Sequence, residues 1–243
     1  VLLGAAVATF FNGSNFIVRK ANMANEMMPV ISRWANGWHG LDAFGDPWNL
    51  ILGLAVFFLA RLLGNMYFIN NIRHEGLILR CRRQLISDAV PFLLFFLAFV
   101  IRTLLKDGFA VDAETQTIVM EPYKYFNNLL AMPYLLILFL VGVIGVLFGL
   151  VKSVLSATYT KGIWFAGTGT VLTVLALLLC VGYNHTAYYP STADLQSSLT
   201  LANSCSSKFT LTTMAYVSIL VPFVLAYIVY AWRAIDSKPI TVD

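Results

Sequence analysis

The sequence predicts an all-α integral membrane protein: a helix bundle with five complete transmembrane helices and part of another at the N-terminus. Hydrophobic residues make up 59% of the chain and charged residues only 12%, whereas soluble domains carry about 25% charged residues. Long apolar runs recur, and they do not alternate polar and apolar residues as a membrane β-strand does. Because so little polar surface cannot cover a globule in water, a membrane protein is favoured over a buried soluble subunit.

Five apolar runs have about the length, roughly 20 residues, that a helix needs to cross the hydrocarbon core. They lie at 48–70, 86–105, 129–151, 163–183 and 211–232. Residues 1–11 are also apolar but form a shorter run, and no basic stretch precedes them as in a signal peptide. We therefore expect 1–11 to be the second half of a spanning helix whose upstream part is missing from this sequence.

Local signals mark several helix ends and contacts. Asp46 is expected to cap the 48–70 helix, with Pro47 at its first position. Prolines in or near helices are expected to produce kinks, and small residues in the 129–151 run are expected to let helices approach closely. These residues are Pro91, Pro133 and Pro222, and Gly142, Gly145 and Gly149.

The distribution of Lys and Arg predicts the orientation, because basic residues concentrate on the cytoplasmic side. Residues 71–85, 152–161 and the C-terminal tail are basic, and they fall on one side if every run spans. Residues 107–127 are acidic and fall on the other side. We therefore expect a multi-pass protein with a cytoplasmic C-terminus. The net charge of +4 comes from these loops, so no nucleic-acid partner is expected.

No residue pattern indicates a catalytic, metal or cofactor site in this chain. Bis-histidine haem ligation needs histidines inside facing helices, and the three histidines are expected in loops or at helix ends. The three cysteines are expected on one side of the membrane, within it and on the other side, so none should pair. These residues are His39, His74 and His185, and Cys81, Cys180 and Cys205.

Arg61 is the strongest candidate for a polar group at membrane depth, with Asn65 one helical turn further along the same face. Two interpretations stay open for Arg61. It could line a hydrophilic path or contact a partner subunit, or it could extend to the cytoplasmic interface. Asp88, near the basic 71–85 loop, is expected to be an interfacial charge.

Two classes of function follow from the residues alone: a subunit that works beside a cofactor-bearing partner, and a polytopic secondary transporter or permease. Transporters place carboxylates or broken helices near the middle of the membrane. No Asp or Glu is expected in the interior of any apolar run, which weakens the second class.

The polar stretch before the last apolar run carries a more specific pattern. Its elements, in order, are Pro190-Ser191, Ser198-Leu199-Thr200, Ser206-Ser207, Thr210-Leu211 and Met214. This order resembles the segment before the last helix of subunit 2 of cytochrome bd-type quinol oxidases. The segment "DPWNLILGLAVFFLARLLGNMYF" is similar to another helix of that family, through Gly53, Gly64 and Tyr67, and "FFNGSNF" is similar to the end of its fourth helix.

The resemblance implies a single membrane domain, 1–243, that corresponds to the last six of about nine helices. Residues 1–11 would end a first four-helix bundle, 48–183 would form a second, and 211–232 would be an additional peripheral helix. It also implies a respiratory complex of the bacterial inner membrane that oxidises quinol and reduces dioxygen to water. Haem b and haem d would be bound by the partner, subunit 1. This chain would pair with and stabilise subunit 1 in a heterodimer, in contact with lipid, and would help to form routes for protons or oxygen.

The polar stretch itself is expected to be structural, with Pro190, Ser191, Ser206 and Ser207 in a lid at the outer surface. Hydroxyl groups can satisfy backbone groups in a compact loop, and Thr210 or Ser207 could cap the final helix.

Overall fold

The computed structural model describes residues 1–19 and 31–235. Its elements follow the order α1 (Leu2–Asn12), β1 (Phe16–Arg19), β2 (Ile31–Trp34), η1 (Leu41–Gly45), α2 (Pro47–Asn71), α3 (Glu75–Leu105), β3 (Gly108–Val111), β4 (Ile118–Glu121), α4 (Lys124–Ala131), α5 (Pro133–Leu155), α6 (Gly162–Gly182), η2 (Leu195–Ser197), α7 (Lys208–Ser218) and α8 (Val221–Ile235).

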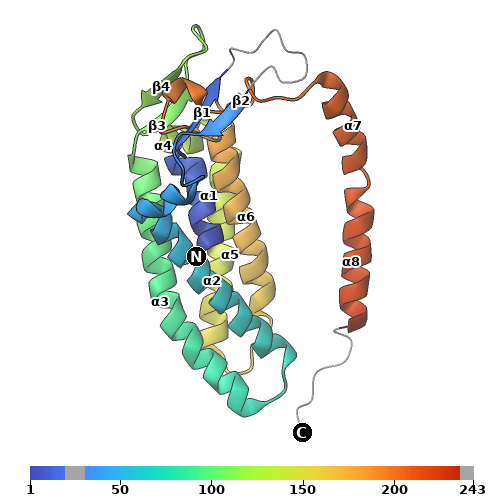
Figure 1. Cartoon of the computed structure of the whole chain (residues 1–243). Helices are drawn as coiled ribbons and strands as arrows, with labels where there is room; N and C mark the ends of the chain where they lie inside the picture. The colour runs from blue at the N-terminus through green and yellow to red at the C-terminus, as the bar shows by residue number, and fades with distance from the viewer. Residues whose placement is uncertain (20–30, 236–243) are drawn as a thin grey trace.

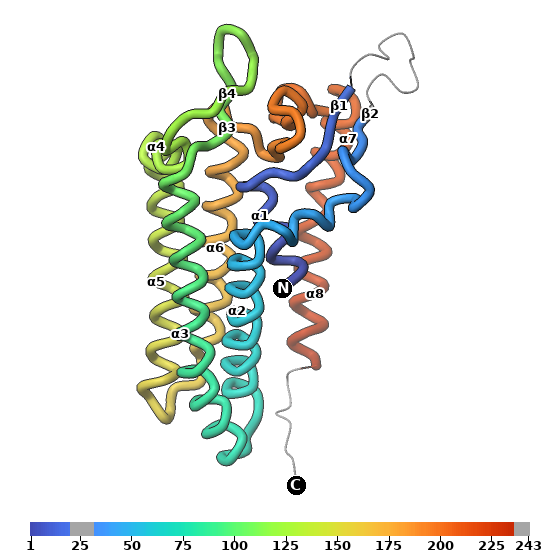
Figure 2. Tube along the Cα trace, turned by 60° about the vertical axis from the view of Figure 1, so that its left-hand side comes forward, coloured from blue at the N-terminus to red at the C-terminus, as the bar shows by residue number. Residues whose placement is uncertain are grey.

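The described residues contain five helical stretches that are long and apolar enough to cross a membrane, which confirms the sequence prediction. Four of them, α2, α3, α5 and α6, lie side by side lengthwise, with the shorter α1 beside α2 (Figures 1 and 2). The fifth stretch, Lys208–Ile235, comprises α7 and α8 and stands apart from the bundle (Figure 1). None of the described residues of α7 and α8 is buried.

Two helix boundaries differ from the sequence prediction because of local chemistry. The run expected at 129–151 divides at Met132, where α4 ends and α5 begins. Pro133 has no amide hydrogen and restricts the residue before it to an extended backbone, so the helix restarts there. The helix expected at 86–105 begins at Glu75 rather than at residue 86, since the His74 side chain caps it by accepting from Leu77 N.

Other helix ends follow the prediction. Asp46 caps α2 by accepting from Trp48 N at 2.9 Å, and Pro47 occupies the first turn. The last spanning stretch is interrupted at Ile219 and Leu220, directly before Pro222. Because Pro222 cannot donate to the preceding turn, it accounts for this break.

Close backbone contact joins α5 to α6. A Cβ atom added to Gly142 would lie 2.7 Å from Thr173 N, and one added to Gly169 would lie 2.5 Å from Gly142 O. These distances leave no room for a side chain, so glycine is required at both positions. The small residues expected to allow close helix approach therefore do so.

Short strands and loops cover the end of the bundle at which α4 lies (Figure 2). Strands β1 and β2 pair antiparallel with Phe16 opposite Trp34, and β3 and β4 pair with Gly108 opposite Glu121. The segment after α6 forms two isolated bridges, one from Ser191 to Ser14, between α1 and β1, and one from Thr186 to Ala110 in β3. The opposite end carries the α2–α3 connection.

Candidate functional site

The candidate site is a polar cluster between α2 and α3, which we call the Asp88 cluster and define as Arg61, Asn65, Gln84 and Asp88. The two helices are antiparallel neighbours joined by residues 72–74 (Figure 1). Arg61 and Asn65 are four residues apart on α2, and Gln84 and Asp88 are four residues apart on α3. Residues four apart share a helix face, so both pairs point into the same contact.

Three side chains donate hydrogen bonds to the Asp88 carboxylate. Arg61 Nε lies 3.1 Å and Asn65 Nδ2 lies 3.4 Å from Oδ2, while Gln84 Nε2 lies 3.0 Å from Oδ1. Only 2% of Asp88 is exposed. The carboxylate of Asp88 thus points into the helix contact and is satisfied there, while its expected position at the membrane interface stays a prediction.

The cluster lies inside both helices rather than at their ends. Arg61 is ten residues before Asn71, so it is about 15 Å from the C-terminal end of α2 at 1.5 Å per residue. Asp88 is 13 residues after Glu75, or about 20 Å from the start of α3. A lone charge in hydrocarbon costs about 2.5–3.5 kcal/mol, and the contact between Arg61 and Asp88 gives each charge a counter-charge.

The two partners differ in exposure. The side chain of Arg61 is 42% exposed, whereas that of Asp88 is 3% exposed. The guanidinium carbon lies 5.7 Å from the centre of the Phe57 ring, a residue that is also exposed on this face of α2. The cluster thus connects a buried carboxylate to the surface of the bundle.

Arg82 fastens the N-terminal part of α3 to the C-terminal end of α5, a role that sequence reasoning missed. Its Nη1 donates to the carbonyl oxygens of Ser153 and Ser156. Its Nη2 donates to Ala157 O at 2.8 Å and Tyr159 O at 3.0 Å. The last carbonyls of a helix carry partial negative charge, so one guanidinium satisfies the C-terminal end of α5 and the turn after it.

Lys106 holds the C-terminal end of α1, a contact that sequence reasoning also missed. Its Nζ donates to Phe11 O and to Asn12 Oδ1, and Tyr125 OH donates to Phe11 O at 3.3 Å. Burial lowers the pKa of Lys106 to about 8, with repulsion from Arg102 adding to the shift and attraction to Asp46 opposing it.

The polar stretch before α7 is a compact, internally bonded loop. Ser191 is 1% exposed; its hydroxyl donates to Phe16 O and accepts from Asp194 N at 3.2 Å. Pro190 O accepts from Ser14 N at 3.0 Å. These contacts tie the loop to the segment after α1 and support the structural interpretation of Pro190 and Ser191.

The other two loop residues lie near the last helix. Ser207 caps α7, its hydroxyl accepting from Thr210 N at 3.3 Å, which confirms one of the two predicted caps. Ser206 is exposed. Unlike Ser191, neither belongs to the bonded part of the loop.

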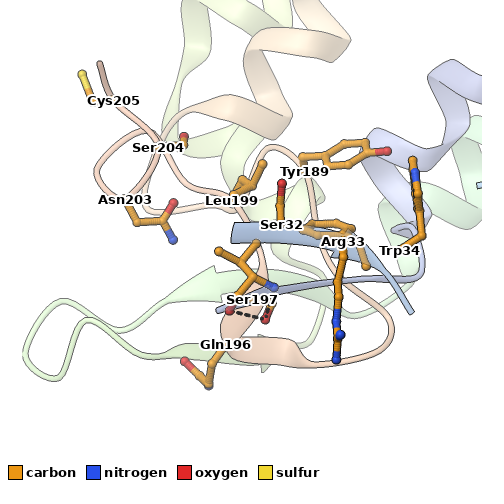
Figure 3. Close-up of a pocket in the computed structure, with 12 residues that line it drawn as sticks. Ser32, Arg33, Trp34, Tyr189, Gln196, Ser197, Leu199, Asn203, Ser204 and Cys205 are labelled. Carbon is orange, nitrogen blue, oxygen red and sulfur yellow. Dashed lines mark hydrogen bonds between the residues drawn. The ribbon is translucent and has the colours of Figure 1, made fainter. Parts of the chain in front are cut away.

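A cavity of about 570 Å³ opens beside this loop, between it and the β1–β2 hairpin (Figure 3). Aromatic, polar and basic side chains line it, with Phe16 stacked on Tyr189 at a centroid distance of 5.3 Å. The residues labelled around it include Arg33, Trp34, Gln196, Asn203 and Cys205.

The histidines lie at helix ends or in loops, as predicted. His74 caps α3, His185 follows α6 with a positive φ, and His39 precedes η1. A bundle haem needs ligands that face each other inside the membrane, and these positions do not fit that geometry. In the described part of the chain, no three His, Cys, Asp or Glu residues are grouped as metal ligands would be.

The cysteines also fall at separate places. Cys81 and Cys180 are buried on α3 and α6, and Cys205 is exposed in the loop before α7; all are free thiols. Cys180 Sγ donates to Tyr125 O at 3.3 Å, so it contributes to packing of α4 against α6.

The fold and the Asp88 cluster define a class: a polytopic, helical membrane protein with an internal ion pair. The chain belongs to the cytochrome bd terminal oxidase subunit II family, whose model matches residues 1–235. This match confirms the family that the loop and helix motifs indicate. No curated protein matches the chain.

Family membership makes the chain a subunit of an oxygen-reducing respiratory complex, with subunit I as the implied partner. The family match also favours the first of the two function classes, a subunit beside a partner, over a transporter, independently of where carboxylates fall in the apolar runs.

Proposed function

We propose that this chain is the haem-free subunit of a bacterial cytochrome bd-type quinol:dioxygen oxidoreductase. In this proposal it pairs with and stabilises subunit I, which binds haem b and haem d, and quinol is oxidised by the complex. The observation that carries the proposal is the family match over residues 1–235. The positions of the three histidines, outside the middle of every spanning helix, support the assignment of both haems to the partner.

The proposal includes an arrangement in the bacterial inner membrane. The basic α2–α3 connection and the C-terminal end of α8 lie at the same end of the molecule (Figure 1), which supports a shared cytoplasmic side by the positive-inside rule. The grouping into a first bundle that ends at residue 11, a second at 48–183 and a peripheral helix at 211–232 is part of the same proposal. The separation of α7 and α8 from the bundle supports the last point.

Help in forming routes for protons or oxygen is the finest part of the proposal. Two apolar cavities, of about 270 and 180 Å³, lie between the helices at membrane depth, and both are lined by Leu59, Phe92, Phe96 and Val174. A neutral gas can enter apolar space of this kind, whereas a proton cannot. The cavities therefore support the oxygen route rather than the proton route.

The test is a reduced-minus-oxidised visible spectrum of the complete protein with whatever co-purifies, followed by the same spectrum of this subunit alone. Haem bands only in the co-purified complex are expected. Bands retained by the isolated subunit would show that it ligates haem itself. Absence of bands from both preparations would contradict membership of a working oxidase and favour a transporter.

A further inference from the structure

The exposed side of α3 changes from basic to apolar along its length. Arg80 and Arg83 are exposed near its N-terminal end, and Ser87, also exposed, follows one turn after Arg83. From Val90 onward, every exposed residue of α3 is a branched aliphatic one. These residues are Val90, Leu94, Leu97, Ile101 and Leu105. They recur every three or four positions and so form one stripe on the helix, which we call the α3 stripe.

The length of α3 agrees with a membrane boundary at these arginines. Its 31 residues extend about 46 Å at 1.5 Å per residue, whereas the hydrocarbon core is about 30 Å thick. Polar residues directly follow Leu105, which places one boundary there. About 20 residues counted back from Leu105 span the core and reach Ile86. Arg80 and Arg83 therefore lie in the part of α3 that exceeds the core, at the level of the lipid headgroups.

The neighbouring helix α5 has a boundary at the same level. Its exposed residues between 137 and 151 are all apolar, and Lys152 is the first charged residue of the helix. Arg82 fixes the relative level of the two helices, because its guanidinium donates to the carbonyl oxygen of Ser153. Arg83 follows Arg82 and Lys152 precedes Ser153 in the chain, so the change from apolar to basic falls at one level on both helices.

The charges of Arg80 and Arg83 are not used within the part of the chain that the structure describes. Neither side chain has an ion pair or a hydrogen bond among residues 1–19 and 31–235. The two arginines are three positions apart and share a helix face, whereas Arg82 between them points to α5. Two neighbouring guanidinium groups attract an anion, and the forked N–H donors of arginine match the oxygen atoms of a phosphate.

The α3 stripe indicates that a lipid carries this phosphate. Contacts between helices in membranes are enriched in small residues that let the backbones approach, as Gly142 and Gly169 do between α5 and α6. The α3 stripe exposes only branched aliphatic side chains between Val90 and Leu105, so it lacks the features of such a contact. Acyl chains pack against side chains of this kind, and their phosphate then lies at the boundary, where the arginines are.

We propose that Arg80 and Arg83 bind the phosphate of an anionic phospholipid whose acyl chains lie along the α3 stripe. An anionic lipid is favoured over a zwitterionic one, because the cationic group of a zwitterionic headgroup is repelled by the second arginine. The site lies on this chain alone, so the inference does not depend on the haem-free role proposed above.

The first experiment measures lipid selectivity in the complete complex. The complex is depleted of lipid in detergent and titrated with dioleoylphosphatidylglycerol or dioleoylphosphatidylcholine, while its unfolding temperature is measured. We expect phosphatidylglycerol to stabilise the parent at lower concentration than phosphatidylcholine does. The double variant Arg80→Gln, Arg83→Gln should raise the half-saturating concentration of phosphatidylglycerol by about fivefold for each arginine removed.

The control removes the same number of positive charges at the other end of the molecule, where β2 and the start of α7 lie (Figure 1). Arg33→Gln with Lys208→Gln, both exposed in the parent, should leave the half-saturating concentration unchanged. Four results would overturn the inference: equal responses of the parent to both lipids, no change in the arginine variant, an equal loss in the control, or saturation of the site by glycerol 3-phosphate without a lipid.

The second experiment asks whether lipid covers the α3 stripe. In complexes with Cys205→Ser, a bimane fluorophore is attached at Leu79→Cys or at Leu97→Cys, two leucines that are 60% and 50% exposed on either side of the proposed boundary. In bilayers that contain phosphatidylglycerol with brominated acyl chains, the label at position 97 should be quenched by the lipid. The label at position 79 should instead be quenched by aqueous iodide. A label at position 97 that brominated lipid does not quench would show that protein covers the stripe and would overturn the inference.

Discussion

At the scale of single residues, the clearest predictions come from the contacts of charged side chains that the fold buries. Asp88 lies near the middle of α3 and Lys106 directly follows its last residue, and the fold takes both ionisable groups out of water. Each has specific partners. Removal of these partners should be costly, because an unpaired buried charge is strongly destabilising. Their surroundings predict different responses to substitution and to pH.

Replacement of Asp88 by alanine should destabilise the bundle. Arg61 would lose its counter-charge, and Asn65 and Gln84 would lose their acceptor. Loss of one partner of a buried pair costs about 3–5 kcal/mol, and the partial exposure of Arg61 reduces the expected loss to about 2 kcal/mol. Unfolding in detergent checks this, with the exposed Glu114→Ala as a control that should change little.

The pKa of Lys106 predicts a pH dependence of stability. Burial lowers this pKa from 10.5 to about 8, so the folded protein releases the proton at a lower pH than the unfolded chain. Stability at this site should therefore rise as the pH increases from about 8 to about 10.5, and below pH 8 the buried charge carries its full penalty. Thermal unfolding between pH 7 and 10 should show a flatter profile for Lys106→Met than for the parent protein; parallel profiles would contradict the assignment.

The loop serines provide a matched pair. Ser191 is buried and bonded to backbone groups of Phe16 and Asp194, whereas Ser206 is exposed. Ser191→Ala should cost about 1–3 kcal/mol, because it leaves buried groups without a partner. Ser206→Ala should fall within about 0.5 kcal/mol of the parent. If instead Ser206→Ala and Ser207→Ala left the complex assembled but abolished quinol oxidation, the structural role of the loop would be wrong.

At the scale of elements, the α5–α6 pair depends on backbone contact. A Cβ atom on Gly169 would lie 2.5 Å from Gly142 O, whereas one on Gly167 would meet nothing within 4 Å. Gly169→Ala should therefore push the helices apart and destabilise the bundle by about 1–3 kcal/mol. Gly167→Ala is the control and should be neutral or stabilising, because alanine favours helix. Equal effects in unfolding experiments would contradict the close contact.

Elements were more predictable from the sequence than the site was. Length and apolar composition suffice to identify the spanning stretches, and the cap at Asp46 and the break at Pro222 follow from local chemistry. The ion pair of Arg61 and Asp88 did not follow, because it depends on how α2 and α3 face each other. A signal existed: both residues are charged, fall within neighbouring apolar runs and have amide residues four positions away.

At the scale of the whole molecule, the described residues fall into a packed bundle and one separate helical stretch. Residues of α7 and α8 bury nothing against the rest of the chain. Their apolar surface is then available to lipid or to a partner, and the family supplies subunit I as that partner.

Removal of the chain after Ser206 tests this division. The shortened protein should unfold at nearly the same temperature as the parent subunit, because no packed core is lost. The free energy of unfolding should change by no more than about 0.5 kcal/mol. The two proteins would be compared as isolated subunits in detergent, by circular dichroism during heating. A large drop in unfolding temperature would show that α7 and α8 support the bundle.

The ion pair between α2 and α3 also bears on how the chain enters the membrane. Arg61 and Asp88 each stand within an apolar helix, and an unpaired charge that enters the hydrocarbon costs about 2.5–3.5 kcal/mol. Only Ile72, Arg73 and His74 separate the two helices, so they can leave the translocon together as a helical hairpin with the charges already paired. The unit of insertion during biogenesis would then be this hairpin rather than either helix by itself.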